Sequence, residues 1–280
     1  MYADWLVPDW PAPSCVRAIF STRHGGCSAL PYDSMNLGDH VGDSQVHVQA
    51  NRALLQRATG TRAVFMQQVH GNAVQMLDEA TPDGLVADAC FTTKKQLACT
   101  VMVADCLPVL LASSDGSWVA AAHAGWRGLA GGEETQNSTD ESVVESVFKS
   151  FSATATQLPR SVAPKLIAWL GPCIGPSAFE VGAEVKRAFE ASQRGAGDFF
   201  EPAGDGKFLA DLAGLARQRL QALGITQIFG NDASASWCTV GNPVKYFSHR
   251  RDAGALGNGF GTTGRMAACI WLATQDERAY

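Results

Sequence analysis

The sequence predicts an α/β fold whose strands form a mixed sheet. Short apolar runs over 97–103, 108–112 and 118–122 are bounded by turn residues, a pattern typical of buried strands. Segments with helical spacing of apolar residues and with capping signals lie between such runs. Neither an internal repeat nor a long linker divides the 280 residues. One α/β domain with a substantial core is therefore the simplest arrangement.

The N-terminal part of the chain predicts a strand followed by a helix. The apolar run 16–22 predicts the strand, and residues 45–59 predict the helix. Asp43 or Ser44 can cap the start of this helix, because short polar side chains satisfy the first free N–H groups. Gly60 is placed to end it, since glycine readily adopts the left-handed conformation of a helix C-terminus.

The next elements are expected to form a hairpin. The runs 63–69 and 73–77 flank Gly71 and Asn72, which predicts a tight turn with His70 at its tip. The remaining elements are expected as a helix over 139–151 with a capping box of Ser138 and Glu141, a strand over 165–170, helices over 183–193 and 209–223, and strands over 225–229 and 266–272.

Composition limits the classes of function. The formal net charge is −5, and the sequence lacks the basic face that general nucleic-acid binding requires. The first residues show no secretory signal pattern, and no apolar stretch reaches membrane-spanning length. The eight cysteines include no Cys-x-x-Cys pair, and a chain of this size needs no disulfide framework. We expect a soluble cytoplasmic protein, a monomer or weak dimer, that binds neither nucleic acid nor membranes.

Three metal-capable residues stand at the ends of apolar runs. His70, Cys106 and His123 could each be an ordinary hydrogen-bonded residue, but three of them at strand ends favour a shared metal site. One Cys and two His suit Zn²⁺ with a fourth position left for water or substrate, and Cu²⁺ is the alternative metal. A four-copper laccase is excluded, because the chain has six histidines and no His-x-His pair.

Four residues are candidates for binding substrate or phosphate. Arg127 follows a Gly-Trp pair, Arg250 follows His249, and Arg23 opens a glycine-rich loop. A guanidinium matches the geometry of phosphate, although surface ion pairing is the usual role of an arginine. Asn36, in a turn-rich segment, is the fourth candidate. Because the chain as a whole is acidic, an anionic ligand would need such a local basic pocket.

Catalytic groups are expected beside the metal-capable cluster. Asp105 and Glu180 are the carboxylates best placed as general acid or base, with ligand orientation or backbone capping as the alternative role. Cys106 is assigned to catalysis as well as to the metal. Cys173 and the distant His249 form an alternative nucleophile–base pair, but nothing near Cys173 in the sequence predicts a lowered thiol pKa.

Six motifs follow one another along nearly the whole chain. They are QQVHGN at 67–72, ADAC at 87–90, VADCLPVLL at 103–111, HAGWRGLAGG at 123–132, GPCIGPSAFEVG at 171–182 and SHRRD at 248–252. In these motifs the chain resembles the laccase-domain (YfiH-like) family, also called the polyphenol oxidase or purine nucleoside phosphorylase family. The resemblance implies a single-domain, mixed-sheet α/β sandwich over residues 1–280, and it places His70, Cys106 and His123 on the family's metal ligands.

The resemblance also implies an enzyme that acts on purine nucleosides and phosphate, with zinc or alternatively copper as its metal. The implied reactions are phosphorolysis of adenosine, inosine, guanosine and methylthioadenosine, and deamination of adenosine. Two other assignments stay open. One is an amidase that removes wrongly incorporated amino acids from peptidoglycan precursors, which would need a longer groove and arginines for a diphosphate. The other is a polyphenol oxidase with copper at the single site.

Overall fold

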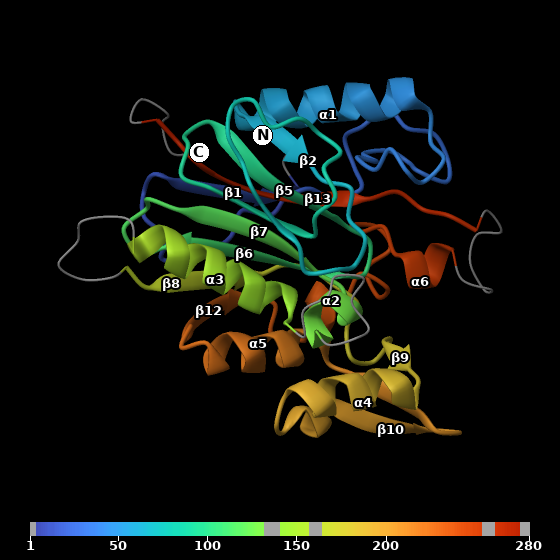
Figure 1. Ribbon diagram of the computed structural model, residues 1–280. Helices are drawn as coiled ribbons and strands as arrows, with labels where there is room; N and C mark the ends of the chain where they lie inside the picture. The colour runs from blue at the N-terminus through green and yellow to red at the C-terminus, as the bar shows by residue number, and fades with distance from the viewer. Residues whose placement is uncertain (1–3, 132–140, 157–163, 254–260, 275–280) are drawn as a thin grey trace.

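Two β-sheets lie face to face at the centre of the protein, and helices cover their outer faces (Figure 1). The computed structural model describes residues 4–131, 141–156, 164–253 and 261–274. Among these residues the first sheet has four strands in the order β1-β13-β5-β2, with β5 and β2 parallel and the other pairs antiparallel. These strands are β1 (Val16–Phe20), β2 (Arg62–Phe65), β5 (Leu97–Val103) and β13 (Met266–Leu272).

The second sheet has six strands within the described part of the chain, in the order β12-β8-β6-β7-β4-β3. Its outer pairs, β12 with β8 and β4 with β3, are parallel, and the inner pairs are antiparallel. Both large sheets are therefore mixed. The strands are β3 (Val74–Met76), β4 (Ala89–Thr92), β6 (Leu107–Ser113), β7 (Val119–Ala124), β8 (Leu166–Leu170) and β12 (Gln227–Gly230).

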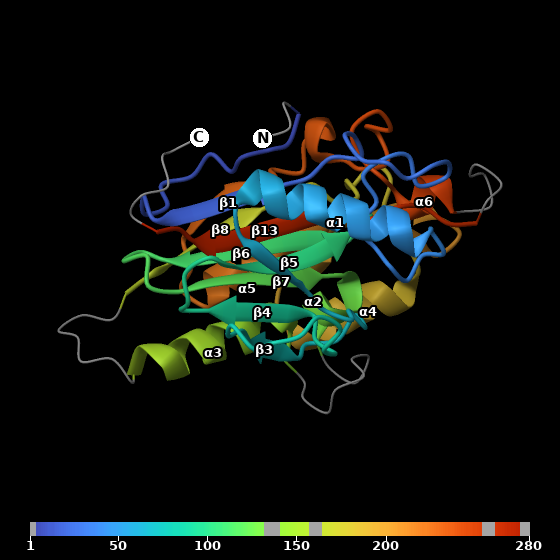
Figure 2. The ribbon, with the colours of Figure 1, turned by 90° about the horizontal axis from the view of Figure 1, so that it is seen from above.

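Helices close the sandwich on both sides. Helix α1 (Gln45–Thr59) lies over the four-stranded sheet, as Figure 2 shows from above, and α3 (Val143–Thr156) and α5 (Leu212–Ala222) cover the six-stranded sheet. In the described ranges, no helix is both long and apolar enough to cross a membrane. The remaining elements are α2 (Trp126–Ala130), α4 (Ala183–Ser192), α6 (His249–Asp252), η1 (Ala196–Phe199), η2 (Ala235–Trp237) and the small antiparallel sheet of β9 (Glu180–Val181), β10 (Phe200–Gly204) and β11 (Lys207–Ala210).

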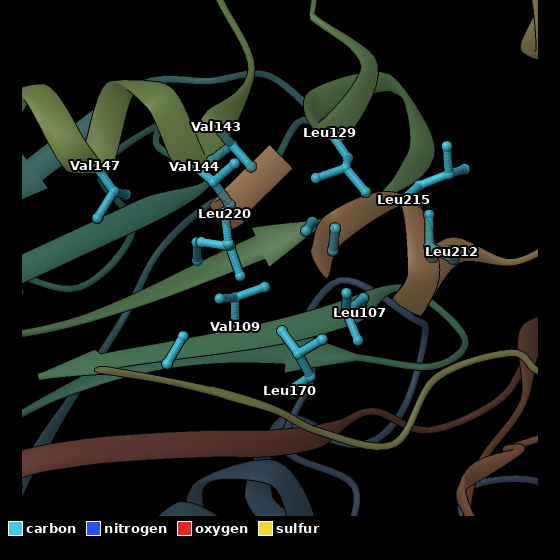
Figure 3. Packing of buried hydrophobic residues seen from close by; sticks show 14 of the residues in the cluster. Leu107, Val109, Leu129, Val143, Val144, Val147, Leu170, Leu212, Leu215 and Leu220 are labelled. Atoms are coloured by element: carbon cyan, nitrogen blue, oxygen red, sulfur yellow. The ribbon is translucent and has the colours of Figure 1, made fainter. Parts of the chain in front are cut away.

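Successive side chains of a central strand point alternately to the space between the sheets and to the helices outside. On β6, Leu110 and Ala112 pack between the two sheets, whereas Leu107, Val109 and Leu111 belong to the cluster under α3 and α5. This is the two-residue period of a strand that is buried on both faces. Figure 3 shows the cluster on the helical side. Each aliphatic side chain buried there contributes roughly 1.5–3 kcal/mol.

Several predicted elements are confirmed with the same bounds. The strands expected at 97–103 and 266–272 are β5 and β13, and the helix expected at 45–59 is α1. Gly60 ends α1 in the left-handed conformation, with φ at 68°. These segments are recognisable because their local pattern and their tertiary environment agree.

The predicted hairpin at 63–69 and 73–77 is wrong. β2 and β3 lie in different sheets, where each runs parallel to another strand. Between them, the N–H groups of Val69, His70 and Gly71 donate to the Asp88 carboxylate instead of pairing across a turn. The chain thus crosses from one sheet to the other at His70.

Helix α3 begins with a capping box formed by Ser142 and Glu145. The predicted box of Ser138 and Glu141 has the same spacing, but Ser138 lies outside the described residues. Glu145 N donates to Ser142 Oγ at 3.3 Å, and Ser142 N donates to Glu145 Oε2 at 2.7 Å. Helix α3 therefore begins at Val143 rather than at 139.

Candidate metal centre

Two crossings between the sheets bring the candidate ligands together. His70 lies on the connection from β2 to β3, and Cys106 on the connection from β5 to β6. His123 lies in β7, opposite Pro108 of β6. His70 and Asp105 adopt positive φ values of 62° and 90° at these crossings, a conformation that costs free energy in most residues.

The three side chains are close enough to share one ion. Their ligand atoms all lie within 4.8 Å of one another, and the distance from Cys106 Sγ to His70 Nε2 is 3.7 Å. His123 is buried, Cys106 is half-buried and His70 is exposed, so the cluster opens toward solvent. Within the described residues, this is the one group of three or more metal-capable side chains that meet in this way.

A buried carboxylate that the sequence analysis missed holds the cluster. Asp88 is fully buried just before β4, and its Oδ1 accepts a hydrogen bond from His123 Nδ1 at 2.8 Å. It also accepts the N–H groups of Val69, His70 and Gly71, between 2.7 and 3.1 Å. This bond fixes the His123 tautomer and leaves Nε2 as the ligand atom, the usual arrangement behind a metal-bound histidine. The sequence signal was a lone carboxylate inside the apolar VADAC segment.

Gly125 leaves room for the cluster. A Cβ atom at this position would lie 2.8 Å from His70 Cδ2 and 3.1 Å from Cys106 Sγ. Both distances are shorter than ordinary van der Waals contacts, so a side chain at Gly125 would push two candidate ligands apart. The lack of a side chain at Gly125, the first glycine of the HAGWRG motif, is therefore explained by the cluster beside it.

The cluster is electrostatically coupled. Burial alone would raise the pKa of Cys106, but the charges and hydrogen bonds of His123 and His70 outweigh it and lower the pKa to about 6. Burial opposes charge on His123 as well, yet Cys106 and Asp88 raise the His123 pKa to about 9. Between these values the metal-free cluster holds a thiolate beside an imidazolium. A thiolate is the form in which cysteine binds metals.

We expect the metal-free protein to react with iodoacetamide at Cys106 at a rate that rises through pH 6 and levels off by about pH 7. The direction follows from the lowered pKa, because the reactive thiolate is already formed at neutral pH. Peptide-resolved mass spectrometry across pH 5–9 would separate Cys106 from the exposed Cys27. A rate that still climbs between pH 7 and 9, as for an ordinary thiol, would contradict the assignment, and added zinc should suppress the reaction.

The cluster lines a pocket of about 410 Å³. Its lining includes apolar side chains, among them Met102, Ile174 and Phe179, as well as cationic and imidazole groups. The lining residues are His40, Gln68, His70, Met102, Val103, Ala104, Asp105, Cys106, His123, Trp126, Ile174, Phe179, Leu212, His249, Arg250 and Arg265. Pockets of this volume hold small molecules.

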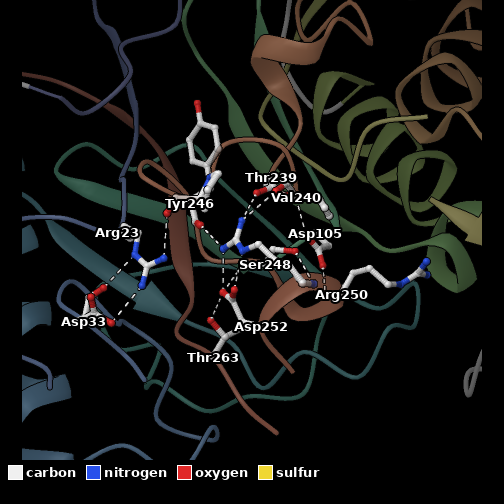
Figure 4. A network of polar contacts seen from close by, with 12 residues as sticks. Arg23, Asp33, Asp105, Thr239, Val240, Tyr246, Ser248, Arg250, Asp252 and Thr263 are labelled. Carbon is white, nitrogen blue, oxygen red and sulfur yellow. Dashed lines mark hydrogen bonds and ion pairs between the residues drawn. The ribbon is translucent and has the colours of Figure 1, made fainter. Parts of the chain in front are cut away.

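The predicted anion-binding residues are not all brought together. Arg250 lines the pocket, and its Nη1 donates to Glu180 O at 3.0 Å. Arg127 is exposed and stacks on the Trp126 ring, and it is not among the lining residues. Arg23 pairs with Asp33 at 3.1 Å, outside the pocket lining (Figure 4).

Asn36 is fully buried behind the pocket wall. Its Oδ1 accepts the N–H groups of Gly38 and Arg265, both at 2.9 Å. It therefore holds the backbone that presents Arg265, a lining residue that the sequence analysis missed. The only sequence signal for Arg265 was its position directly before the apolar run of β13. Substrate binding by Arg23, Asn36 and Arg127 stays a prediction.

The two candidate carboxylates occupy different places. Asp105 lines the pocket, and its oxygens accept from Thr239 Oγ1 at 2.5 Å and from Arg250 N at 2.6 Å, so it anchors the start of α6 (Figure 4). Glu180 is exposed in β9 and is not among the lining residues. Their catalytic roles stay predictions.

The alternative thiol nucleophile lies in an unfavourable environment. Cys173 is buried, and burial together with the charge of Asp211 raises its pKa well above the usual value. Its Sγ accepts a hydrogen bond from Asn231 Nδ2 at 3.3 Å. His249, its predicted partner, lines the pocket, whereas Cys173 does not. This geometry gives no support to the alternative pair.

Fold and site together define a mixed α/β protein with a Cys/His₂ cluster, able to hold one metal ion, in the wall of a small-molecule pocket. The chain matches the family described as multi-copper polyphenol oxidoreductase laccase over residues 17–273, and it belongs to that family. The family is metal-associated, and the described part of the chain contains one candidate cluster.

Individual relatives are similar in sequence to this chain over almost its full length. Purine nucleoside phosphorylase YfiH of Escherichia coli is 45% identical over 269 residues, which are 95% of this chain and 98% of the relative. A purine nucleoside phosphorylase of Pseudomonas aeruginosa is 42% identical over 270 residues, which are 96% and 98% of the two chains.

Solved structures confirm the fold. A Neisseria meningitidis protein of the DUF152 family superposes with a TM-score of 0.81 at 40% identity, covering 97% of this chain and 100% of the other. YlmD from Geobacillus stearothermophilus gives a TM-score of 0.83 at 26% identity, covering 98% of both chains. The predicted mixed α/β fold and the predicted family are thus confirmed.

Proposed function

We propose that this protein is a purine nucleoside phosphorylase that holds zinc at His70, Cys106 and His123. The observation that carries the proposal is the metal-capable cluster in the wall of a pocket of about 410 Å³. Support for the reaction comes from the name of the relatives that are 42% and 45% identical over nearly the whole chain. We also propose that residues 1–280 form a single domain.

The pocket offers different surfaces to the parts of a nucleoside and a phosphate. The lining includes the apolar side chains of Phe179, Ile174 and Met102, which suit contact with a purine ring. Burial and the charge of Arg265 lower the pKa of His249, so its imidazole is neutral at pH 7 and can donate an N–H to a purine nitrogen. In phosphorolysis the C1′–N9 bond breaks, a phosphate oxygen bonds to C1′, and the purine takes up a proton. The pocket must therefore hold both reactants together.

The residues present fit a zinc ion. Asp88 holds His123 Nδ1 and leaves Nε2 toward the cluster, and Cys106 is a thiolate at neutral pH. When bound, the ion supplies Lewis acidity toward an oxygen of phosphate or of the nucleoside. One thiolate and two imidazoles suit Zn²⁺ and also admit Cu²⁺, so metal analysis of the purified protein is part of the test.

We extend the proposal to inosine, guanosine and methylthioadenosine as further substrates and to deamination of adenosine. The apolar lining residues, such as Phe179, support this breadth, because an apolar side chain would contact a purine ring without selecting its exocyclic groups. Among the described lining residues Asp105 is the one carboxylate, and both of its oxygens already accept hydrogen bonds from the protein.

The zinc-loaded protein with adenosine and inorganic phosphate should release adenine and ribose 1-phosphate, with inosine as the deamination product. Omitting phosphate should stop release of adenine and leave formation of inosine. Chromatography of the reaction mixture measures all of these products. Absence of nucleoside turnover, together with amino-acid release from a peptidoglycan precursor, would favour the amidase. If the copper-loaded protein oxidises a phenol and turns over no nucleoside, that result would favour the oxidase.

A further inference from the structure

Arg265 is a cation in the pocket wall that has no acidic partner among the described residues. It is half-buried at the start of β13, and its Nη1 donates to the carbonyl oxygens of Thr263 at 2.9 Å and Gly264 at 3.1 Å. Among the described residues, no carboxylate lies within ion-pair distance of its guanidinium. By contrast, the neighbouring Arg52 pairs with Asp39 at 3.2 Å.

The position of Arg265 is built by the surrounding chain. Asn36 Oδ1 accepts its N–H, and Leu37 N donates to its carbonyl oxygen at 3.1 Å. Gly38 leaves room for its side chain, since a Cβ there would lie 2.8 Å from Arg265 Cγ. The stem is therefore clamped, and little side-chain entropy remains to be lost when a ligand binds.

Both anionic and cationic groups act on Arg265. Burial lowers its pKa, while Cys106 and Asp105 act in the opposite sense, and an arginine stays charged in either case. The Asp105 oxygens are taken by Thr239 and Arg250. Arg250 adds a second, more exposed positive charge to the same pocket. A partly desolvated guanidinium that no described carboxylate pairs with directly gains from a ligand that supplies anionic oxygens.

We propose that Arg265 anchors an oxyanion subsite that binds inorganic phosphate, with Arg250 as its second cation. The choice of phosphate rests on the proposed function, whereas anion binding itself rests on the geometry. The guanidinium fork can donate to two oxygens of one phosphate, which a lysine cannot reproduce. The same chemistry would fit the 5′-phosphate of a nucleotide, and the experiment separates the two sources.

The test measures binding and turnover separately, on zinc-loaded wild type, Arg265→Met and Arg265→Lys. Phosphate should raise the thermal midpoint of wild type, and the shift should vanish in Arg265→Met. The KM for phosphate should rise about 10- to 100-fold in Arg265→Met and less in Arg265→Lys, while the KM for adenosine changes little. Arg217→Met is the matched control, because Arg217 is also half-buried and bonded to backbone carbonyls but does not line the pocket.

Each outcome decides one of the two proposals. Equal phosphate shifts in wild type and Arg265→Met, or no shift in wild type, would overturn the subsite. If phosphate raises the thermal midpoint of wild type but not of Arg265→Met, and wild type shows no phosphorolysis, the subsite is supported and the proposed reaction is rejected. Stabilisation by AMP but not by inorganic phosphate would overturn the choice of ligand. If Arg265→Met does not fold, Arg265→Lys decides in the same assays, since it retains the charge without the fork.

Discussion

Cys106→Ala is expected to lose zinc binding by about two to three orders of magnitude and to lose nucleoside phosphorolysis with it. Complete sites bind zinc with about 10–16 kcal/mol from four ligands, so each ligand is worth about 2.5–4 kcal/mol. In this protein the loss removes the one soft ligand and leaves two imidazoles, His70 and His123. Competition with a chromophoric chelator measures the affinity, and release of adenine from adenosine measures the activity.

Cys173→Ala is the matched control for this substitution. It also removes a buried thiol, but Cys173 bonds to Asn231 and to its own loop rather than to the cluster. We expect it to retain zinc and activity. The site assignment is incorrect if Cys106→Ala binds zinc as wild type does. Loss of activity in Cys173→Ala with zinc still bound would instead revive the Cys173–His249 pair.

Several strands could be predicted because they are buried on both faces. β5 and β13 are continuous apolar runs, which indicates buried strands, and both strands are indeed buried along their whole length. The assignment of strands to sheets could not be predicted in the same way. β2 and β3 are close in sequence and look like a hairpin, but Asp88, nearly twenty residues away, takes the N–H groups that a turn would have paired.

The candidate site was predictable to the extent that its residues carry distinctive chemistry. His70, Cys106 and His123 were expected to meet, and their ligand atoms do lie within 4.8 Å of one another. Asp88 and Arg265 were missed because a single aspartate or arginine has many ordinary roles. Their importance comes from partners distant in sequence, His123 for Asp88 and Asn36 for Arg265.

Asp88→Asn is expected to weaken zinc binding about 10- to 100-fold and to cost about 3 kcal/mol of unfolding free energy. The carboxylate accepts four hydrogen bonds, from His123 Nδ1 and from three consecutive N–H groups around His70. An amide of the same size retains one acceptor oxygen and turns an NH₂ group toward donors, so buried N–H groups lose their partner. His123 also loses the charge that holds its tautomer. Urea unfolding of the metal-free protein and chelator competition measure the two effects.

Asp43→Asn separates positioning of the ligands from general destabilisation. Asp43 is another buried carboxylate, and it accepts hydrogen bonds from Ser28, Asn36 and Ser44 without touching the cluster. We expect it to lower the free energy of unfolding while zinc affinity stays within about threefold of wild type. If both variants weaken zinc binding to the same degree, Asp88 acts only through stability. A weaker zinc affinity confined to Asp88→Asn is the result that a carboxylate dedicated to orienting His70 and His123 requires.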